Sequence, residues 1–239
     1  MAFIRITHND FEERYNAFHG DTFNENEWED AERIDDDSWV ARYKYEADLV
    51  SKYIKEYDCK TVLEIGSGPG TLCKFVYEKS SDELVYHMLD KKYAKKHHKD
   101  RGYPGKLFVN DLNDGIDAKP LLKDGYDLIV CNDVLEHLSN PTKIVQQLYH
   151  LNTGKGKMFI SIPNWRMAHQ MTYRGMWDYD NFLYFMAIHG YEGLSVEGSI
   201  LQTPYYKKLD SEELLDDSLL RSWNWYFTFD KDPNFHRRK

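Results

Sequence analysis

The chain has 239 residues and a formal net charge of −9. Such an acidic balance lacks the excess of Lys and Arg on which general affinity for nucleic acid or anionic membranes depends. No apolar run approaches the roughly 18 residues that span a bilayer, and three scattered cysteines do not make a disulfide framework. We therefore expect a cytoplasmic protein with one catalytic domain, and neither a DNA nor a membrane partner. The sequence does not indicate an oligomeric state.

The first 37 residues are predicted to form an N-terminal extension or lid, and residues 38–239 the catalytic domain. Eight acidic residues lie between Glu25 and Asp37, which is typical of a solvated segment. From Ser38 onward, apolar residues recur at spacings of four, three and four, which predicts an amphipathic helix. The apolar stripe consists of Tyr43, Ala47, Val50 and Ile54.

Strands and helices then alternate along the chain. Strands are expected at residues 61–65, 83–90, 105–111, 126–133 and 156–164. Helices are expected between them, the clearest at 71–79, 91–100 and 141–151, the last beginning with a favourable Asn140-Pro141 pair. This alternation predicts an α/β fold with a doubly wound, mainly parallel sheet, whose ligands bind at the carboxyl ends of the strands.

The last third departs from simple alternation. The pattern predicts a helix, a strand, a short acidic helix and a β-rich run, at 180–191, 193–201, 211–220 and 222–230.

A glycine-rich stretch, VLEIGSGPG (62–70), follows the first predicted strand. Glycine lets a backbone take positive φ and approach a ligand closely, as in nucleotide-binding turns. A dinucleotide fold would place its third glycine at position 71, where this chain has Thr71. The stretch instead resembles the E-x-G-x-G-x-G motif of class I S-adenosylmethionine (SAM)-dependent methyltransferases.

The resemblance implies a seven-stranded sheet with one antiparallel strand near the C-terminus, and SAM as cofactor with S-adenosylhomocysteine as product. The glycine loop would pass beneath the methionyl part of SAM. Asp90, at the end of the second strand, can accept hydrogen bonds from the ribose hydroxyls, and Asp111 would bond the adenine amino group. The residues implied in cofactor binding are Trp39, Arg42, Glu64, Gly66, Ser67, Gly68, Gly70, Asp90, Lys91, Asp111, Leu112, Asn132, Asp133 and Val134.

The stretch VLEHLSNP (134–141) resembles the branch that contains ubiquinone-type and many small-molecule O- and N-methyltransferases. We therefore predict methyl transfer to an oxygen or nitrogen of a small-molecule acceptor. Two alternatives remain: an RNA ribose 2′-O-methyltransferase, and a non-catalytic subunit of this fold that supports a partner. The motifs N-P-P-Y, D-P-P-Y and P-C, which mark DNA base methyltransferases, are absent after the fourth strand.

His137 is the candidate catalytic residue, because it follows the fourth strand and imidazole titrates near neutral pH. Asp133, Glu136 and His137 are also similar to the E-x-x-E-H cluster with which small-RNA terminal 2′-O-methyltransferases hold a divalent ion. That cluster needs a further histidine; His169 and His189 lie in no matching motif, so we predict no metal.

Acceptor selection is expected in the aromatic segment 165–184, together with the N-terminal extension and the residues before Trp223. Several aromatic residues are candidates either for the wall of the acceptor pocket or for the core: Trp165, Tyr173, Trp177, Trp223 and Trp225.

Overall fold

The structure is a computed structural model that describes residues 37–80, 83–163, 179–199 and 224–235. Within these ranges, the side chains of residues 37–39, 179, 180, 194 and 196–199 are not described. The predicted extension therefore lies almost wholly outside the described residues, and its boundary stays a prediction. The predicted acidic helix at 211–220 also lies outside them.

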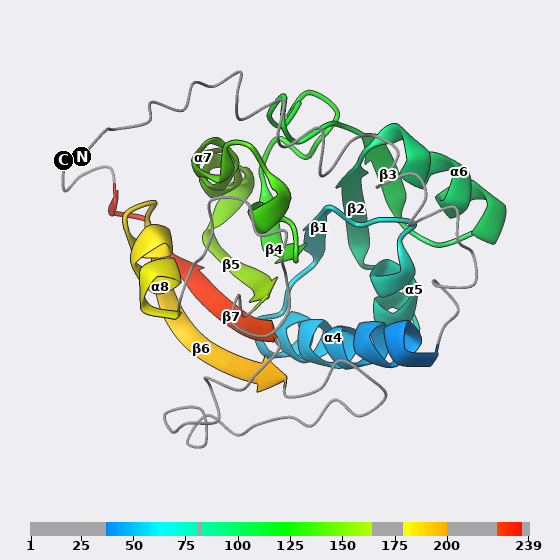
Figure 1. Cartoon of the computed structure of the whole chain (residues 1–239), viewed down its shortest axis with the longest axis horizontal. Coiled ribbons are helices and arrows are strands. Elements are labelled where there is room, and N and C mark those ends of the chain that lie inside the picture. The colour runs from blue at the N-terminus through cyan, green and yellow to red at the C-terminus, as the bar shows by residue number, and fades with distance from the viewer. Residues whose placement is uncertain (1–36, 81–82, 164–178, 200–223, 236–239) are drawn as a thin grey trace, which may run out of the picture.

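Seven strands form one sheet in the order β3-β2-β1-β4-β5-β7-β6. The five strands β1 to β5 pair in parallel, whereas β7 runs antiparallel to both of its neighbours. The predicted fold class is therefore confirmed (Figure 1). The strands are β1 (Thr61–Ile65), β2 (Val85–Asp90), β3 (Lys106–Val109), β4 (Tyr126–Asn132), β5 (Asn152–Pro163), β6 (Tyr191–Ser199) and β7 (Asn224–Lys231).

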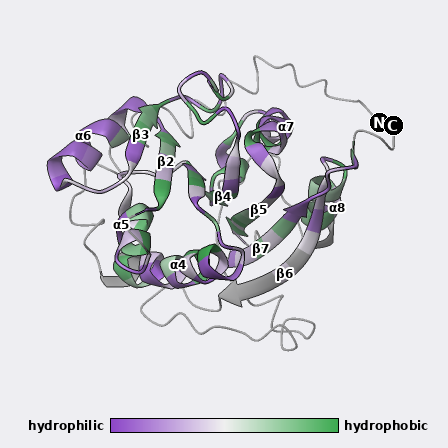
Figure 2. Ribbon diagram, turned by 180° about the vertical axis from the view of Figure 1, so that it is seen from behind, coloured by the Kyte–Doolittle hydropathy of each residue, from purple (hydrophilic) through white to green (hydrophobic). Residues whose placement is uncertain are grey.

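Helices cover both faces of the sheet (Figure 1). Helices α4 and α5 contribute to one core cluster with the sheet, and α7 and α8 to the other. Figure 2 shows the contrast between the hydrophobic α5 and the hydrophilic α6, in which only Ala94 is buried. The helices are α4 (Asp37–Glu56), α5 (Thr71–Tyr77), α6 (Lys92–Arg101), the short 3₁₀ helix η1 (Leu135–His137), α7 (Pro141–Leu151) and α8 (Tyr179–Ala187).

The alternation of side chains along the central strands explains why two cores form. In β1, Val62 joins the α4/α5 cluster and Leu63 joins the α7/α8 cluster, since successive side chains point to opposite faces. The predicted stripe of α4 is confirmed, because Ala47 and Val50 are fully buried against the sheet. The predicted start of α7 is also confirmed, since the Asn140 side chain accepts a hydrogen bond from the Lys143 amide.

Two predicted boundaries differ from the structure by four residues each. The helix expected through Tyr191 ends at Ala187, because Gly190 turns the chain at φ 90° and β6 begins directly afterwards. Strand β5 begins at Asn152 rather than Gly156, immediately after α7. Neither change affects the carboxyl ends of β1 to β5, which share one edge of the sheet and carry the candidate site. Within the described residues, no helix combines the length and apolar character needed to cross a bilayer.

Candidate active site

The loop after β1 holds its glycines in conformations that other residues avoid. Gly66, Gly68 and Gly70 have φ values of 67°, 53° and 90°. The Gly66 amide donates a hydrogen bond to the Leu89 carbonyl at 2.8 Å, which ties the loop to the end of β2. A Cβ atom on Gly66 would lie 2.3 Å from a methyl group of Val134, so glycine is required for both dihedral and steric reasons.

Asp90, the last residue of β2, fixes the other side of this loop. Its buried carboxylate accepts hydrogen bonds from the backbone amides of Gly68 and Lys91, both at 2.6 Å. Burial raises the pKa of Asp90, and these hydrogen bonds oppose that effect. Tyr93 also donates a side-chain hydrogen bond to this carboxylate, which leaves it capacity for a further donor. Ser67, also in the predicted set, is buried in the same loop and bonds the Gly68 carbonyl.

The end of β3 lies beside this loop and carries two more of the predicted residues. The Lys91 ammonium is 3.5 Å from the Asp111 carboxylate. Asp111 also accepts a hydrogen bond from the Asn113 amide at 3.0 Å. Leu112, which lies between Asp111 and Asn113 in the sequence, is buried. The structure thus brings the predicted residues of three strand ends to one edge.

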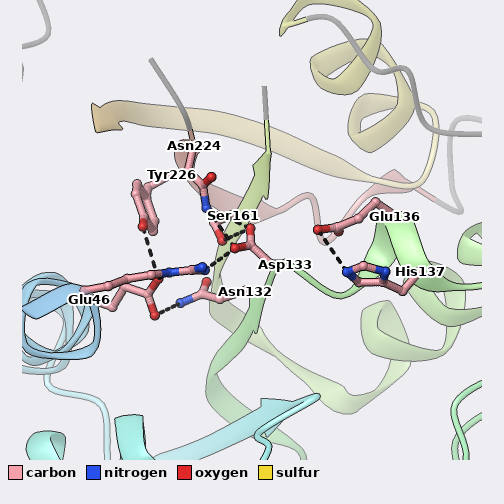
Figure 3. A network of polar contacts seen from close by, with 9 residues as sticks. Glu46, Asn132, Asp133, Glu136, His137, Ser161, Asn224 and Tyr226 are labelled. Atoms are coloured by element: carbon pink, nitrogen blue, oxygen red, sulfur yellow. Dashed lines mark hydrogen bonds and ion pairs between the residues drawn. The ribbon is translucent and has the colours of Figure 1, made fainter. Parts of the chain in front are cut away.

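Asp133, directly after β4, is the centre of a polar network (Figure 3). Its carboxylate accepts hydrogen bonds from Ser161 and Asn224 and forms an ion pair with Arg42. Burial alone raises the pKa of Asp133, but the Arg42 charge and these hydrogen bonds hold it below its usual range. With these donors in place, the carboxylate oxygens of Asp133 are saturated, so the group acts as a clamp between α4, β4, β5 and β7.

Glu46 is part of this network and was not predicted from the sequence. It is 1% exposed and accepts hydrogen bonds from Arg42 at 2.8 Å, Tyr226 at 3.1 Å and Asn132 at 3.2 Å (Figure 3). Its position three residues after Tyr43 places it on the buried stripe of α4, which was the available signal. Arg42 therefore pairs with two acids, the buried Glu46 and the partly buried Asp133.

One acceptor atom in this network has no hydrogen-bond partner among the described residues. The Asn132 side chain donates to Glu46, while its Oδ1 atom is buried and unpaired. A buried carbonyl oxygen without a donor is costly. Its position at the end of β4 suits a ligand that presents an ammonium or amide group.

Glu64, on β1, is buried beneath the glycine loop and accepts a hydrogen bond from Tyr86 at 2.9 Å. Burial raises its pKa to about 8, and the nearby Glu46 and Asp90 contribute to the increase while the Tyr86 hydrogen bond opposes it. Glu64 is therefore mostly protonated at neutral pH.

This shift has a measurable consequence for stability. The folded-state pKa of about 8 exceeds the ordinary value of 4.5, so Glu64 stabilises the fold below pH 4.5 and loses that contribution as pH rises toward 8. We expect the free energy of unfolding of the wild type to fall relative to Glu64→Gln by about 1.4 kcal/mol per pH unit over this interval. Urea denaturation of both proteins from pH 4.5 to 8 tests this. Parallel plots of the free energy of unfolding against pH would contradict it, because the other buried acids are present in both the wild type and Glu64→Gln.

Glu136 and His137 lie on η1, beyond the polar network (Figure 3). The Nε2 atom of His137 is 3.7 Å from Oε1 of Glu136. The His137 side chain is 35% exposed, whereas that of Glu136 is 1% exposed. The candidate base thus lies at the same sheet edge as the glycine loop, three residues after Val134.

Several predicted residues lie outside the described side chains: Trp39, Trp165, His169, Tyr173, Trp177 and Trp223. Of the candidate pocket walls, Trp225 is described and is buried in the α7/α8 core, which supports the core alternative for this residue. His189 bonds the Phe185 carbonyl at 2.7 Å. Within the described ranges, no group of three or more His, Cys, Asp or Glu side chains is arranged to hold a metal ion.

Comparison with known proteins identifies the class. Residues 39–194 match the family described as methyltransferase domain, and the chain belongs to that family. The predicted class of enzyme, a SAM-dependent methyltransferase, is thereby confirmed. No curated protein sequence matches the chain significantly.

Solved structures share the fold at low sequence identity. The chain is similar to the 1,6-didemethyltoxoflavin-N1-methyltransferase of Burkholderia thailandensis, crystallised with its acceptor and S-adenosylhomocysteine (12% identity, TM-score 0.60, 97% of this chain and 92% of that chain). It is also similar to the magnesium protoporphyrin IX methyltransferase of Synechocystis, crystallised with SAM (13% identity, TM-score 0.58, 95% and 100%). A third similar structure is the plantazolicin methyltransferase BamL (13% identity, TM-score 0.58, 94% and 90%).

Proposed function

We propose that this protein transfers the methyl group of SAM to an oxygen or nitrogen of a small-molecule acceptor. The observation that carries the proposal is the convergence of four strand ends on one edge of the sheet. This edge brings together the positive-φ glycine loop, the buried Asp90, the Lys91–Asp111 pair and Asn132. Each group has the chemistry that one part of SAM requires.

The residues present fit the cofactor. The glycine loop offers close approach of the backbone, and Asp90 has acceptor capacity left for ribose hydroxyls. The unpaired Oδ1 of Asn132 suits the methionine ammonium. Asp111 and Leu112 would hold the adenine, and Arg42, Glu64 and Asp133 would support the site from behind. When bound, SAM supplies an activated methyl group with a good leaving group.

The chain's own contribution is chiefly to hold the acceptor in line with that methyl group, because such alignment can supply much of the catalysis. His137 is the group that would accept a proton from a hydroxyl or amine acceptor. The small-molecule assignment is supported by the acidic net charge and by the acceptors named for the similar structures. The aromatic segment 165–184 remains the proposed location of acceptor selection.

A direct experiment is to incubate the full chain with SAM and a panel of phenols, carboxylic acids, amines and N-heterocycles, and to measure S-adenosylhomocysteine. Acceptor-dependent formation of this product is the expected result. Turnover with RNA ends alone would favour the RNA alternative, and cofactor binding without turnover on any acceptor would favour a non-catalytic subunit.

Dialysis against a strong chelator is expected to change turnover by less than about twofold. A large loss restored by magnesium would instead assign Asp133, Glu136 and His137 to a metal.

Asp90→Ala is expected to weaken SAM binding at least about tenfold, because it removes charge-assisted hydrogen bonds to the ribose worth roughly 1.5 to 3 kcal/mol each. Isothermal titration calorimetry with SAM, S-adenosylhomocysteine and NAD measures the effect. Tight binding of NAD, or unchanged SAM affinity in the variant, would contradict the assignment.

Asp127→Ala is the matched control for this prediction. Asp127 also accepts hydrogen bonds from two backbone amides, those of Lys60 and Thr61, but at the opposite edge of the sheet. Its loss should lower stability without changing SAM affinity.

A further inference from the structure

Glu136 is a buried acid in the middle of η1. Its side chain is 1% exposed, and neither carboxyl oxygen has a hydrogen-bond partner among the described residues. Burying a polar group without a partner costs free energy that an apolar residue would not. A carboxyl group at this position therefore needs an explanation other than packing.

The surroundings of Glu136 define its chemical state. Among the described residues, the titratable or charged groups that face it are Cys131 from β4, Asp133 directly after β4, Arg42 from α4 and its neighbour His137. Burial, followed by the negative charge of Asp133, raises the pKa of Glu136 well above its usual range, and its own backbone amide and Arg42 oppose this only partly. In its protonated form the group is a carboxylic acid, which has one donor and one carbonyl acceptor.

The candidate base carries a polar atom close to this carboxyl group. Nε2 of His137 lies 3.7 Å from Oε1 of Glu136, slightly beyond hydrogen-bond distance and within reach of a small side-chain adjustment. Histidine bases are commonly oriented by a group that bonds their second nitrogen. In contrast to Glu136, His137 is partly exposed at the sheet edge, where an acceptor can reach it.

We propose that Glu136 is the positioning residue for His137: its carbonyl oxygen accepts a hydrogen bond from Nε2–H and thereby directs Nδ1 toward the acceptor. The inference rests on the proposed function. In the reaction, His137 takes the acceptor's proton at Nδ1 as the acceptor atom forms its bond to the methyl carbon. The sulfur of SAM keeps the electron pair of its broken bond to the methyl carbon, and the imidazolium of His137 later releases the proton to solvent.

The first test needs no acceptor. The ring nitrogens of His137 are followed by ¹⁵N NMR against pH in the full chain, with the signal assigned from His137→Gln. In the wild type they are expected to shift in two steps, one for the imidazole and one for Glu136, because the two groups are coupled. In Glu136→Gln the second step should be lost. Identical titration curves in the two proteins would overturn the pairing.

The second test uses an acceptor identified with the panel above. Glu136→Leu is expected to lower kcat at least about tenfold, while the acceptor KM and the SAM affinity change less than about twofold. Glu136→Gln should retain most of the wild-type kcat at pH 7, because its amide oxygen can still accept a hydrogen bond from Nε2–H of His137. Equal loss in both variants, or loss of kcat together with Tm and SAM affinity, would overturn the proposal.

Asp232→Asn is the matched control, since Asp232 is also buried but lies beyond the C-terminal end of β7, at the opposite edge of the sheet. It should leave the His137 titration and kcat unchanged. If no acceptor is found, the proposed function fails, but the NMR comparison still decides whether Glu136 and His137 act as a pair.

Discussion

Gly66→Ala is expected to weaken SAM binding by at least about tenfold and to lower the free energy of unfolding by roughly 2 to 5 kcal/mol. The left-handed backbone accounts for about 1 to 2 kcal/mol of this cost, since Gly66 has φ 67°. The remainder comes from overpacking, because the new Cβ would meet a Val134 methyl group at 2.3 Å. Chemical denaturation and calorimetry with SAM measure the two effects.

Two further variants separate the strain from the clash. Gly102 has a similar φ of 60°, but nothing lies within 4 Å of a Cβ built there. Gly102→Ala should therefore cost only the backbone term and leave SAM affinity unchanged. The double variant Gly66→Ala/Val134→Ala should be less destabilised than the sum of its single substitutions. Equal destabilisation by the two glycine substitutions would show that the contact with Val134 is unimportant.

Arg42→Met is expected to destabilise the fold by about 3 to 5 kcal/mol, because it leaves the buried carboxylate of Glu46 and the partly buried carboxylate of Asp133 without their cation. Adding Asp133→Asn should recover part of the loss, since one uncompensated charge is then removed. Urea denaturation of the single and double variants measures both effects.

The control for Arg42 is the exposed ion pair between Asp48 on α4 and Lys79, which lies just after α5. Lys79→Met should change stability by no more than about 1 kcal/mol, because exposed pairs are screened by solvent. If Arg42→Met had an equally small effect on stability but weakened SAM binding strongly, Arg42 would be a cofactor ligand rather than part of a structural clamp.

The order of elements could be predicted because each central strand carries its own signal. Strand β1 is a short apolar run followed by the glycine loop, β4 is one that ends at Asn132, and the apolar spacing of α4 follows one helical face. The antiparallel position of β7 came instead from the resemblance to a family. Periodicity alone does not specify that residues 224–231 insert between β5 and β6, since this pairing joins segments far apart in the chain.

The polar network shows the same limit at the level of single residues. Asp133 was identified by its place after a strand, but its partners Ser161 and Asn224 come from strands that are remote in sequence. Glu46 was overlooked because an acid on a helix is usually solvated, although its spacing from Tyr43 placed it on the buried face. The end of α8 was misplaced because the turn at Gly190 interrupts an apolar pattern that continues into β6.

A crystal structure of the full chain grown with S-adenosylhomocysteine would test the central claim most directly. We expect the ribose hydroxyls on Asp90, the methionyl part against the loop from Gly66 to Gly70, its ammonium group at Oδ1 of Asn132, and the sulfur on the side of His137. A ligand bound elsewhere, or an Asp90 carboxylate that makes no contact with the ribose, would contradict the account.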